Sequence, residues 1–116
     1  MIAGRVALSL LCRSDMPIDL HTHSRFSDGS DTPTELVTKA KAIGLSAIAL
    51  TDHDTLEGIT EARSAAARLG IVVVPGVEIS CEWSPGTLHM VVLFLEPAPG
   101  PLQDRLAGLQ AARATR

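Results

Sequence analysis

The sequence is poor in aromatic residues, with no tyrosine, one tryptophan and two phenylalanines among 116 residues. So few aromatic side chains leave few platforms for stacking on nucleic-acid bases. An excess of positive charge is also lacking, because 10 lysines and arginines stand against 13 aspartates and glutamates, a net charge of −3. That balance provides no general surface for polyanions. Both shortages argue against a nucleic-acid-binding module without chemistry of its own.

Cysteines and long apolar runs are scarce too. The two cysteines, Cys12 and Cys81, cannot form a disulfide scaffold, and we expect ordinary thiols in a reducing cytoplasm. No apolar run reaches the ~18 residues that span a bilayer, so no membrane partner is expected. A content of 46% hydrophobic and 20% charged residues is typical of a folded chain rather than a disordered one. The length predicts one domain.

Residues 1–15 are interpreted as a leader or a mis-called start. Arg5 interrupts their apolar run, and Leu11-Cys12-Arg13 is a poor cleavage site for a signal peptide. An extra strand is the alternative interpretation. Met16 stands directly before the first convincing strand, so we assign residues 16–116 to the domain.

Three short apolar runs predict buried strands, at residues 17–20, 45–50 and 71–74. Runs that are apolar throughout suit strands covered on both faces, as in a parallel sheet. The two stretches between them predict helices. The resulting βαβαβ order predicts an α/β fold in which parallel strands are joined by right-handed crossover helices.

The first helix is marked at both ends. Thr32 is the expected N-cap, Pro33 fits the first helical position, and Glu35 completes a capping box. Gly44 is expected to end the helix. Its apolar positions recur at helical spacing and predict a buried stripe of Leu36, Val37, Ala40 and Ile43.

The second helix is expected over residues 56–69, with Asp54 or Thr55 as its cap and Gly70 at its end. The buried stripe predicted for it consists of Ile59, Ala62, Ala66 and Leu69.

The pattern changes after this α/β stretch. Residues 83–87 predict a turn, and residues 88–95 predict a further strand. Leu102, Leu106 and Leu109 then begin another amphipathic helix.

Histidines and acidic residues gather near the ends of the predicted strands. His21 and His23 alternate at the end of the first strand, so both side chains can face one ion. Asp28 lies on the following loop, His53 follows the second strand, and Glu78 follows the third. Sites of parallel α/β folds gather at the carboxyl ends of strands. Imidazole and carboxylate ligands together favour zinc, manganese or iron over calcium.

Four further polar residues have open interpretations. His89 lies inside an apolar run and is predicted to be a core histidine. Asp19 and Asp52 each stand close to a candidate ligand histidine, where a carboxylate can fix the tautomer of the ring. Solvated aspartates at strand ends are the equal alternative. Asp54 is interpreted as a helix cap rather than a ligand.

Four ordered motifs together resemble a known family. They are Asp19-Leu20-His21-Thr22-His23-Ser24 with Ser27-Asp28-Gly29, then Thr51-Asp52-His53-Asp54-Thr55, then Pro75-Gly76-Val77-Glu78-Ile79-Ser80, then Leu88-His89-Met90. This set resembles the PHP (polymerase and histidinol phosphatase) family of metal-dependent phosphoesterases, and is closest to the branch of 5′–3′ exoribonucleases and nucleoside 3′,5′-bisphosphate phosphatases. The His-x-His pair alone would also suit the amidohydrolases.

The resemblance implies the N-terminal portion of a distorted (β/α)7 TIM-like barrel with two or three divalent metal ions. It implies that His21 and His23 bind one metal and that Glu78 bridges to a second. His89 would join the second metal, against its core-histidine interpretation, and Asp28 and His53 would bind a third. Mn²⁺ is the expected ion, with Fe²⁺ or Zn²⁺ as alternatives.

The activity implied is hydrolysis of a phosphate ester by metal-activated water, without a side-chain nucleophile. The substrate would be a phosphorylated small molecule, such as a nucleotide, or an RNA or DNA end. The chain is shorter than a full domain of this family, and the family's later ligands have no counterpart in it. The alternative is therefore a truncated, catalytically incomplete metal-binding fragment that needs the rest of the barrel or a partner chain. Its open sheet edge is a candidate surface for self-association.

Overall fold

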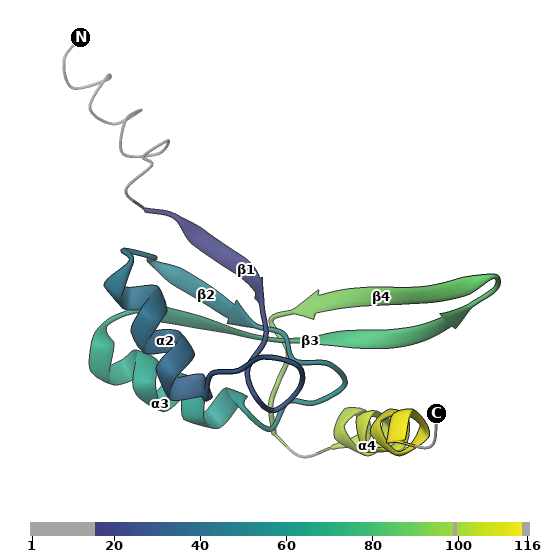
Figure 1. The fold of residues 1–116 in the computed structure, drawn as a ribbon. Helices are drawn as coiled ribbons and strands as arrows, with labels where there is room; N and C mark the ends of the chain where they lie inside the picture. The colour runs from purple at the N-terminus through teal and green to yellow at the C-terminus, as the bar shows by residue number, and fades with distance from the viewer. Residues whose placement is uncertain (1–15, 99, 115–116) are drawn as a thin grey trace, which may run out of the picture.

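The computed structural model describes residues 16–98 and 100–114, which form one four-stranded sheet and three helices (Figure 1). In chain order the elements are β1 (Ile18–Thr22), α2 (Pro33–Ala42), β2 (Ala47–Leu50), α3 (Ile59–Leu69), β3 (Val72–Trp83), β4 (Gly86–Leu93) and α4 (Pro101–Ala114). The interpretation of residues 1–15 as a leader or mis-called start, like that of Cys12, falls outside the described residues.

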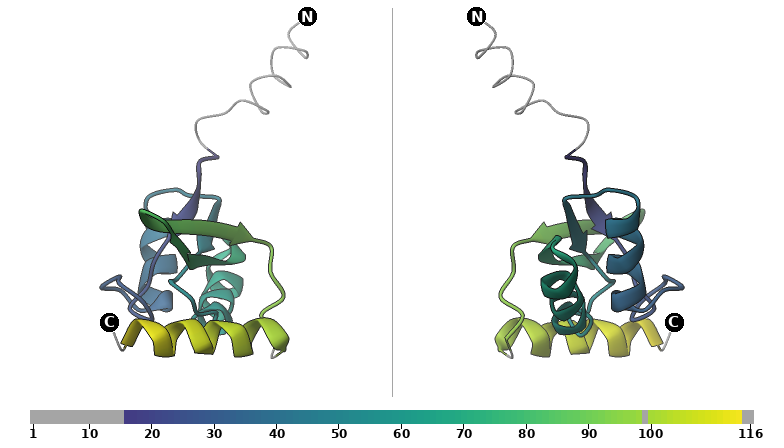
Figure 2. Two further views of the ribbon diagram at one scale, coloured as in Figure 1. Left: turned by 90° about the vertical axis from the view of Figure 1, so that its right-hand side faces the viewer. Right: turned by 90° about the vertical axis from the view of Figure 1, so that its left-hand side faces the viewer.

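The strands lie in the order β1-β2-β3-β4. β1, β2 and β3 are parallel, and β4 runs antiparallel to β3. The predicted α/β fold with parallel strands and crossover helices is therefore confirmed for the first three strands. Helices α2 and α3 lie side by side against the sheet, and α4 passes beneath the loops that follow the strands (Figure 2).

The core lies between the sheet and its helices. β2 contributes Ile48 and Leu50, and β3 contributes Val73 and Val77, all less than one tenth exposed. The helical side of the core consists of Val37 and Ala40 from α2, Ile59, Ala62, Ala65 and Ala66 from α3, and Leu106 from α4. The alanines of α3 have small side chains, so the helix can lie close to its neighbours. Burial of apolar surface drives this packing.

Helix α2 begins where the sequence predicts. The Thr32 hydroxyl accepts the backbone N–H of Glu35 at 3.1 Å, and Pro33 opens the helix. Val37 and Ala40 are buried as expected. The prediction that Ile43 belongs to the buried stripe is wrong, because Ile43 is the C-cap residue and is 75% exposed. The helical period ends before Ile43, and Gly44 follows with φ +91°.

Helix α3 starts later than predicted. The expectation of Asp54 or Thr55 as its cap is wrong, because the N-cap position is Gly58 and no side chain caps it. Thr55 instead accepts the backbone N–H of Glu57 at 3.1 Å, within a separate turn. Local side-chain bonds of this kind compete with helix formation. The predicted end is confirmed, since Gly70 adopts a left-handed φ of +73°.

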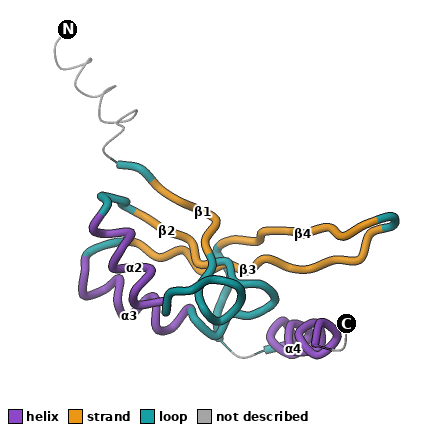
Figure 3. The backbone as a smooth tube through the Cα atoms, in the orientation of Figure 1, coloured by secondary structure: helices purple, strands orange, loops and turns teal. Residues whose placement is uncertain are grey.

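Strand β3 is far longer than its predicted four residues and changes partner along its length. Its first part pairs with β2 up to Leu50↔Pro75, and from Gly76 onward it pairs with β4. A Cβ on Gly76 would lie 2.8 Å from the Val92 carbonyl oxygen, so glycine permits this close junction. The predicted turn joins the two strands, and the β3–β4 hairpin extends away from the parallel strands (Figure 3).

Because β1 and β3 are longer than predicted, two site residues lie within strands rather than after them. His21 belongs to β1, and Glu78 lies in the middle of β3. The amphipathic α4 is confirmed, with Leu106 buried and Leu102 and Leu109 packed against the core. Among the helices of residues 16–98 and 100–114, none has both the length and the apolar character to cross a bilayer.

Candidate metal centre

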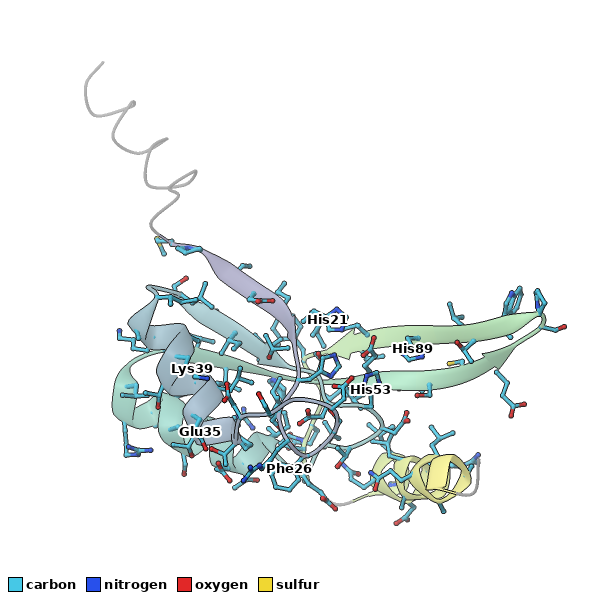
Figure 4. The ribbon with its side chains drawn as sticks, viewed as in Figure 1. His21, Phe26, Glu35, Lys39, His53 and His89 are labelled. Atoms are coloured by element: carbon cyan, nitrogen blue, oxygen red, sulfur yellow. The ribbon has the colours of Figure 1, made fainter. Side chains whose placement is uncertain are left out.

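Candidate ligands from four segments meet at one place. His21 and His23 come from the end of β1, His53 from the loop after β2, Glu78 from β3 and His89 from β4. The labelled rings of His21, His53 and His89 lie near one another where the hairpin leaves the parallel strands (Figure 4). The strand pattern predicts that His21, His23, Asp28, His53 and Glu78 share one side of the sheet. Their ligand atoms lie within 4.8 Å of one another in overlapping groups, even though Glu78 lies inside its strand.

The Glu78 carboxylate is at the centre of the cluster. Its Oε2 lies 3.2 Å from Nε2 of both His23 and His53. Its Oε1 lies 3.4 Å from His21 Nε2 and 3.7 Å from His89 Nδ1. The side chain of Glu78 is only 9% exposed, so four imidazole rings rather than water surround this carboxylate. Burying a carboxylate is costly unless it is paired, which makes the four rings part of its stabilisation.

The backbone places His53 opposite Glu78. The two residues form an isolated parallel bridge beyond the end of β2. Glu78 donates its N–H to the Asp52 carbonyl, and Asp54 donates its N–H to the Glu78 carbonyl, both at 3.0 Å. The His53 ring stacks on that of His23, with the two centroids 4.6 Å apart and 16° between the ring planes.

His89 belongs to the site rather than to the core, so its core-histidine interpretation is wrong. It pairs with Ser80 across the β3–β4 hairpin, which makes it a diagonal neighbour of Glu78 on the same face. Its side chain is 44% exposed. The run around it is apolar although strand β4 is largely exposed, and therefore hydrophobicity alone was misleading.

Asp28 approaches the same rings from the loop after β1. Its Oδ1 lies 3.4 Å from His23 Nδ1, and its Oδ2 lies 3.2 Å from His53 Nε2. Desolvation by burial raises the pKa of Asp28, but the charges of His23 and His53, together with hydrogen bonds, outweigh it and hold the pKa below the usual 3.8. The carboxylate is therefore ionised at neutral pH.

The donor atoms fit a divalent cation. His21 Nε2 and His23 Nε2 lie 3.2 Å apart, and His53 Nε2 faces oxygens of both Asp28 and Glu78. Neutral imidazole nitrogens without a proton and carboxylate oxygens all present lone pairs, so such contacts need a proton or a metal ion between them. Three groups have ligand atoms within 4.8 Å of one another: His21, His23 and Glu78; His23, Asp28 and His53; His53, Glu78 and His89.

Asp19 and Asp52, for which ring orientation and solvation were equal alternatives, lie in different surroundings. The Asp52 carboxylate is buried and accepts the backbone N–H and the hydroxyl of Ser24, both at 2.6 Å, and the Ser27 hydroxyl at 2.7 Å. The Ser27 oxygen lies in turn 3.5 Å from His23 Nδ1. Asp19 is exposed and accepts the backbone N–H of His21 at 3.1 Å.

Ser24 and Ser27 are supporting residues that the sequence reasoning missed. They connect Asp52 to the loop that carries Asp28 and, through the Ser27 hydroxyl, to His23. Both serines lie within the first motif, but only their contacts with a residue 25 or 28 positions away give them this role. A serine in a loop carries no sequence signal that separates it from an ordinary turn residue.

Parallel strands with imidazoles and carboxylates gathered beside their carboxyl ends define an α/β protein with a candidate metal centre. The PHP domain family model matches residues 19–103. The chain therefore belongs to the PHP family, as its four motifs indicated.

Relatives of known name agree with this assignment. The chain is 46% identical over 99 residues to a 3′,5′-nucleoside bisphosphate phosphatase of Chromobacterium violaceum, covering 85% of this chain and 35% of that protein. It is 44% identical over 98 residues to a 5′–3′ exoribonuclease of Haemophilus influenzae, covering 84% of this chain and 36% of the relative. The chain thus spans about a third of the length of the curated relatives it matches.

A solved structure supports the fold. A protein of Bifidobacterium adolescentis described as a metal-dependent phosphoesterase superposes with a TM-score of 0.81 at 35% identity, over 87% of this chain and 35% of the other. The expected fold, part of a PHP TIM-like barrel, is confirmed by this match.

Proposed function

We propose that this chain provides a divalent-metal centre for phosphate-ester hydrolysis, in which His21, His23, Asp28, His53, Glu78 and His89 are the ligands. The observation that carries the proposal is the convergence of four imidazoles on one buried carboxylate. Mixed imidazole and carboxylate ligands favour Mn²⁺, Fe²⁺ or Zn²⁺, and Mn²⁺ is the ion that we expect.

The number of lone pairs limits how many ions the residues can hold together. A neutral imidazole offers one lone pair and so binds one ion. Two of the three ligand groups have only Glu78 in common, and Glu78 has two carboxylate oxygens. One of these groups adds His21 and His23 to Glu78, and the other adds His53 and His89. These two groups would hold two ions, with three protein ligands for each ion. A third ion at Asp28 would compete for His23 or His53.

The burial of the ligands leaves one side open to a substrate. Glu78 and His53 have side chains only 9% and 10% exposed, whereas His21 and Asp28 are 51% and 61% exposed. The buried side chains would anchor the ions, and the exposed ones lie on the side from which a phosphate could approach. His53 Nδ1 is buried without a hydrogen-bond partner among the described residues, so the ring meets its partners through Nε2.

The reaction proposed is hydrolysis of a nucleotide or of an RNA or DNA end. Divalent ions lower the pKa of bound water and neutralise charge on phosphate oxygens, which is the chemistry that they supply when bound. The protein residues hold the ions and need not act as nucleophiles. The names of the relatives, a bisphosphate phosphatase and an exoribonuclease, support nucleoside 3′,5′-bisphosphates and 5′ RNA ends as substrates.

Metal binding without turnover is the second candidate function. Each ligand group offers three protein atoms, and the chain spans about a third of its relatives. In this case the ligands present would need the rest of a barrel, or a partner chain, for activity.

The test combines metal content with turnover. The purified chain is loaded with Mn²⁺, its metal content is measured by elemental analysis, and release of phosphate from adenosine 3′,5′-bisphosphate is compared with cleavage of a 5′-phosphorylated RNA oligonucleotide. His53→Ala removes a ligand of two groups, and Thr38→Ala, at an exposed position of α2, is the matched control.

About two ions per chain, with turnover that His53→Ala abolishes and Thr38→Ala retains, would support the enzyme. Two ions without turnover would support the second candidate. A chain that binds no metal would contradict both.

Two further expectations stay predictions. Self-association is expected through the outer strands β1 and β4, which expose Leu20, Leu88 and Met90. Light scattering of the purified chain measures it. A cytoplasmic location is also still a prediction, and fractionation of the cells tests it.

A further inference from the structure

We propose that Asp54 is a positioning residue of the metal centre. Its carboxylate takes the place of a backbone carbonyl in the pairing between residues 52–54 and β3, and so holds His53 against Glu78. The inference rests on the proposed metal site, and it assigns a function to a residue that lies in none of the three ligand groups.

The pairing follows a parallel ladder up to Asp54. The Glu78 N–H donates to the Asp52 carbonyl, and the Asp54 N–H donates to the Glu78 carbonyl. Hydrogen bonds of a parallel ladder are evenly spaced and alternate between the strands. The next bond would therefore run from the Ser80 N–H to the Asp54 carbonyl. The Ser80 N–H donates instead to Oδ1 of the Asp54 side chain, at 2.8 Å.

The backbone conformation of Asp54 explains the exchange. Its φ is +55°, in the left-handed region that few residues other than glycine, asparagine and aspartate adopt. In this conformation the chain leaves the extended path, and the fully buried side chain supplies the acceptor for Ser80. The Asp54 carbonyl accepts the side-chain amide of Gln110 at 2.6 Å.

These bonds attach Asp54 to both sides of Glu78. The Asp54 N–H binds the carbonyl of Glu78 itself, and the Asp54 carboxylate binds the N–H two residues later. His53 is the residue directly before Asp54, and its Nε2 lies 3.2 Å from Glu78 Oε2. Loss of the carboxylate removes one of the three bonds that hold residues 52–54 against β3, beside the point where the two ligands face each other. Gln110 connects α4 to the same residue, although α4 provides no candidate ligand.

Two substitutions separate the carboxylate from the backbone conformation. Asparagine and glycine both tolerate positive φ, but only asparagine keeps a side-chain oxygen for the Ser80 N–H. Asp54→Asn is expected to bind Mn²⁺ about as tightly as the wild type. Asp54→Gly is expected to bind it about 10- to 100-fold more weakly, as when partners of metal ligands are removed. Titration followed by the electron paramagnetic resonance of free Mn²⁺ measures both affinities.

A spectroscopic readout distinguishes positioning from general stability. The absorption spectrum of bound Co²⁺ reports the ligands around the ion. We expect it to be unchanged in Asp54→Asn and altered in Asp54→Gly at saturating Co²⁺. Equal Mn²⁺ affinities and equal Co²⁺ spectra for the two variants would overturn the inference while leaving the proposed metal site intact. A wild-type chain that binds no Mn²⁺ would instead overturn the proposed function.

A variant of α4 provides a second test if Asp54→Gly fails to fold. Gln110 is exposed, and Gln110→Ala removes the donor to the Asp54 carbonyl. We expect it to weaken Mn²⁺ binding about 2- to 10-fold, the contribution of one hydrogen bond. Gln103→Ala is the matched control, because the Gln103 amide donates to the Glu96 carbonyl, outside the ligand loops. Equal Mn²⁺ affinities for the two glutamine variants would contradict the inference.

Discussion

Gly29 lies directly against the backbone carbonyl group of His23, and a Cβ atom on Gly29 would approach the carbonyl carbon to 2.8 Å. The Gly29 N–H also donates to the Ser24 carbonyl at 2.9 Å, which closes the loop after β1. Asp28 precedes this contact and reaches back to His23 and His53. The glycine of the Ser27-Asp28-Gly29 motif therefore determines where the Asp28 carboxylate, a candidate oxygen ligand, stands.

Replacement of Gly29 by alanine is expected to open this loop. The contact is with backbone, so the loop itself must shift, which costs roughly 1–3 kcal/mol of unfolding free energy. Mn²⁺ affinity is expected to fall about 10-fold as Asp28 moves. Urea unfolding and metal titration measure the two effects. Gly86→Ala is the matched control, since no atom lies within 4 Å of its added Cβ; equal behaviour of the two variants would contradict this role of Gly29.

Glu78→Gln is expected to abolish tight metal binding. Glu78 belongs to two of the three ligand groups, and it is the buried carboxylate that faces all four rings. The loss of metal affinity should exceed the roughly 100-fold loss that follows removal of a hydrogen-bond partner of a metal ligand. Elemental analysis after dialysis checks it. Glu82→Gln, at an exposed position of the same strand, should keep its metal; retention of metal by Glu78→Gln would exclude Glu78 as a ligand.

Asp52→Asn is expected to destabilise the fold even without metal. Three donors from Ser24 and Ser27 meet the buried carboxylate, and an amide offers one acceptor oxygen and adds a donor of its own. The expected loss is about 2–3 kcal/mol of unfolding free energy, measured by urea denaturation of the metal-free chain. Asp104→Asn, exposed in the first turn of α4, should change the free energy by less than about 0.5 kcal/mol. A similar small change for Asp52→Asn would refute the bonding role.

The lowered pKa of Asp28 predicts a pH-dependent contribution of this side chain to the stability of the metal-free chain. Its pKa is lowered below 3.8 in the folded state, so the ionised form stabilises the fold above that value. The contribution is lost as the pH falls through the lowered pKa. It should stay under about 1 kcal/mol, because the side chain is largely exposed. The difference in unfolding free energy between wild type and Asp28→Asn should therefore shrink on acidification, and a difference that grows would contradict the sign.

The alternation of strands and helices could be predicted because it depends on local patterns. Thr32 with Pro33 and Gly70 marked helix ends that the structure confirms, since capping depends on neighbouring backbone groups. The start of α3 could not be predicted in the same way. Asp54 resembles a cap in the sequence, but its carboxylate binds Ser80, which is 26 residues away.

The candidate ligands were identified from motif order, and their relationship to one another was not. His89 had an apolar neighbourhood typical of a core residue, yet it stands diagonally to Glu78 because β4 folds back along β3. The length of β3 and its change of partner at Gly76 were not apparent, because pairing with β4 extends a strand whose local pattern breaks at Pro75.

The sequence by itself determined the α/β order, the family and the six candidate ligands, because periodicity, caps and motifs depend on residues that are close together in the chain. Only the tertiary structure decided that Glu78 faces four rings, that Ser27 lies between Asp52 and His23, and that the Asp54 carboxylate binds Ser80 rather than capping a helix. Each of these depends on a contact between segments distant in the chain. Such contacts are selected by the packing of the whole sheet, which no local pattern encodes.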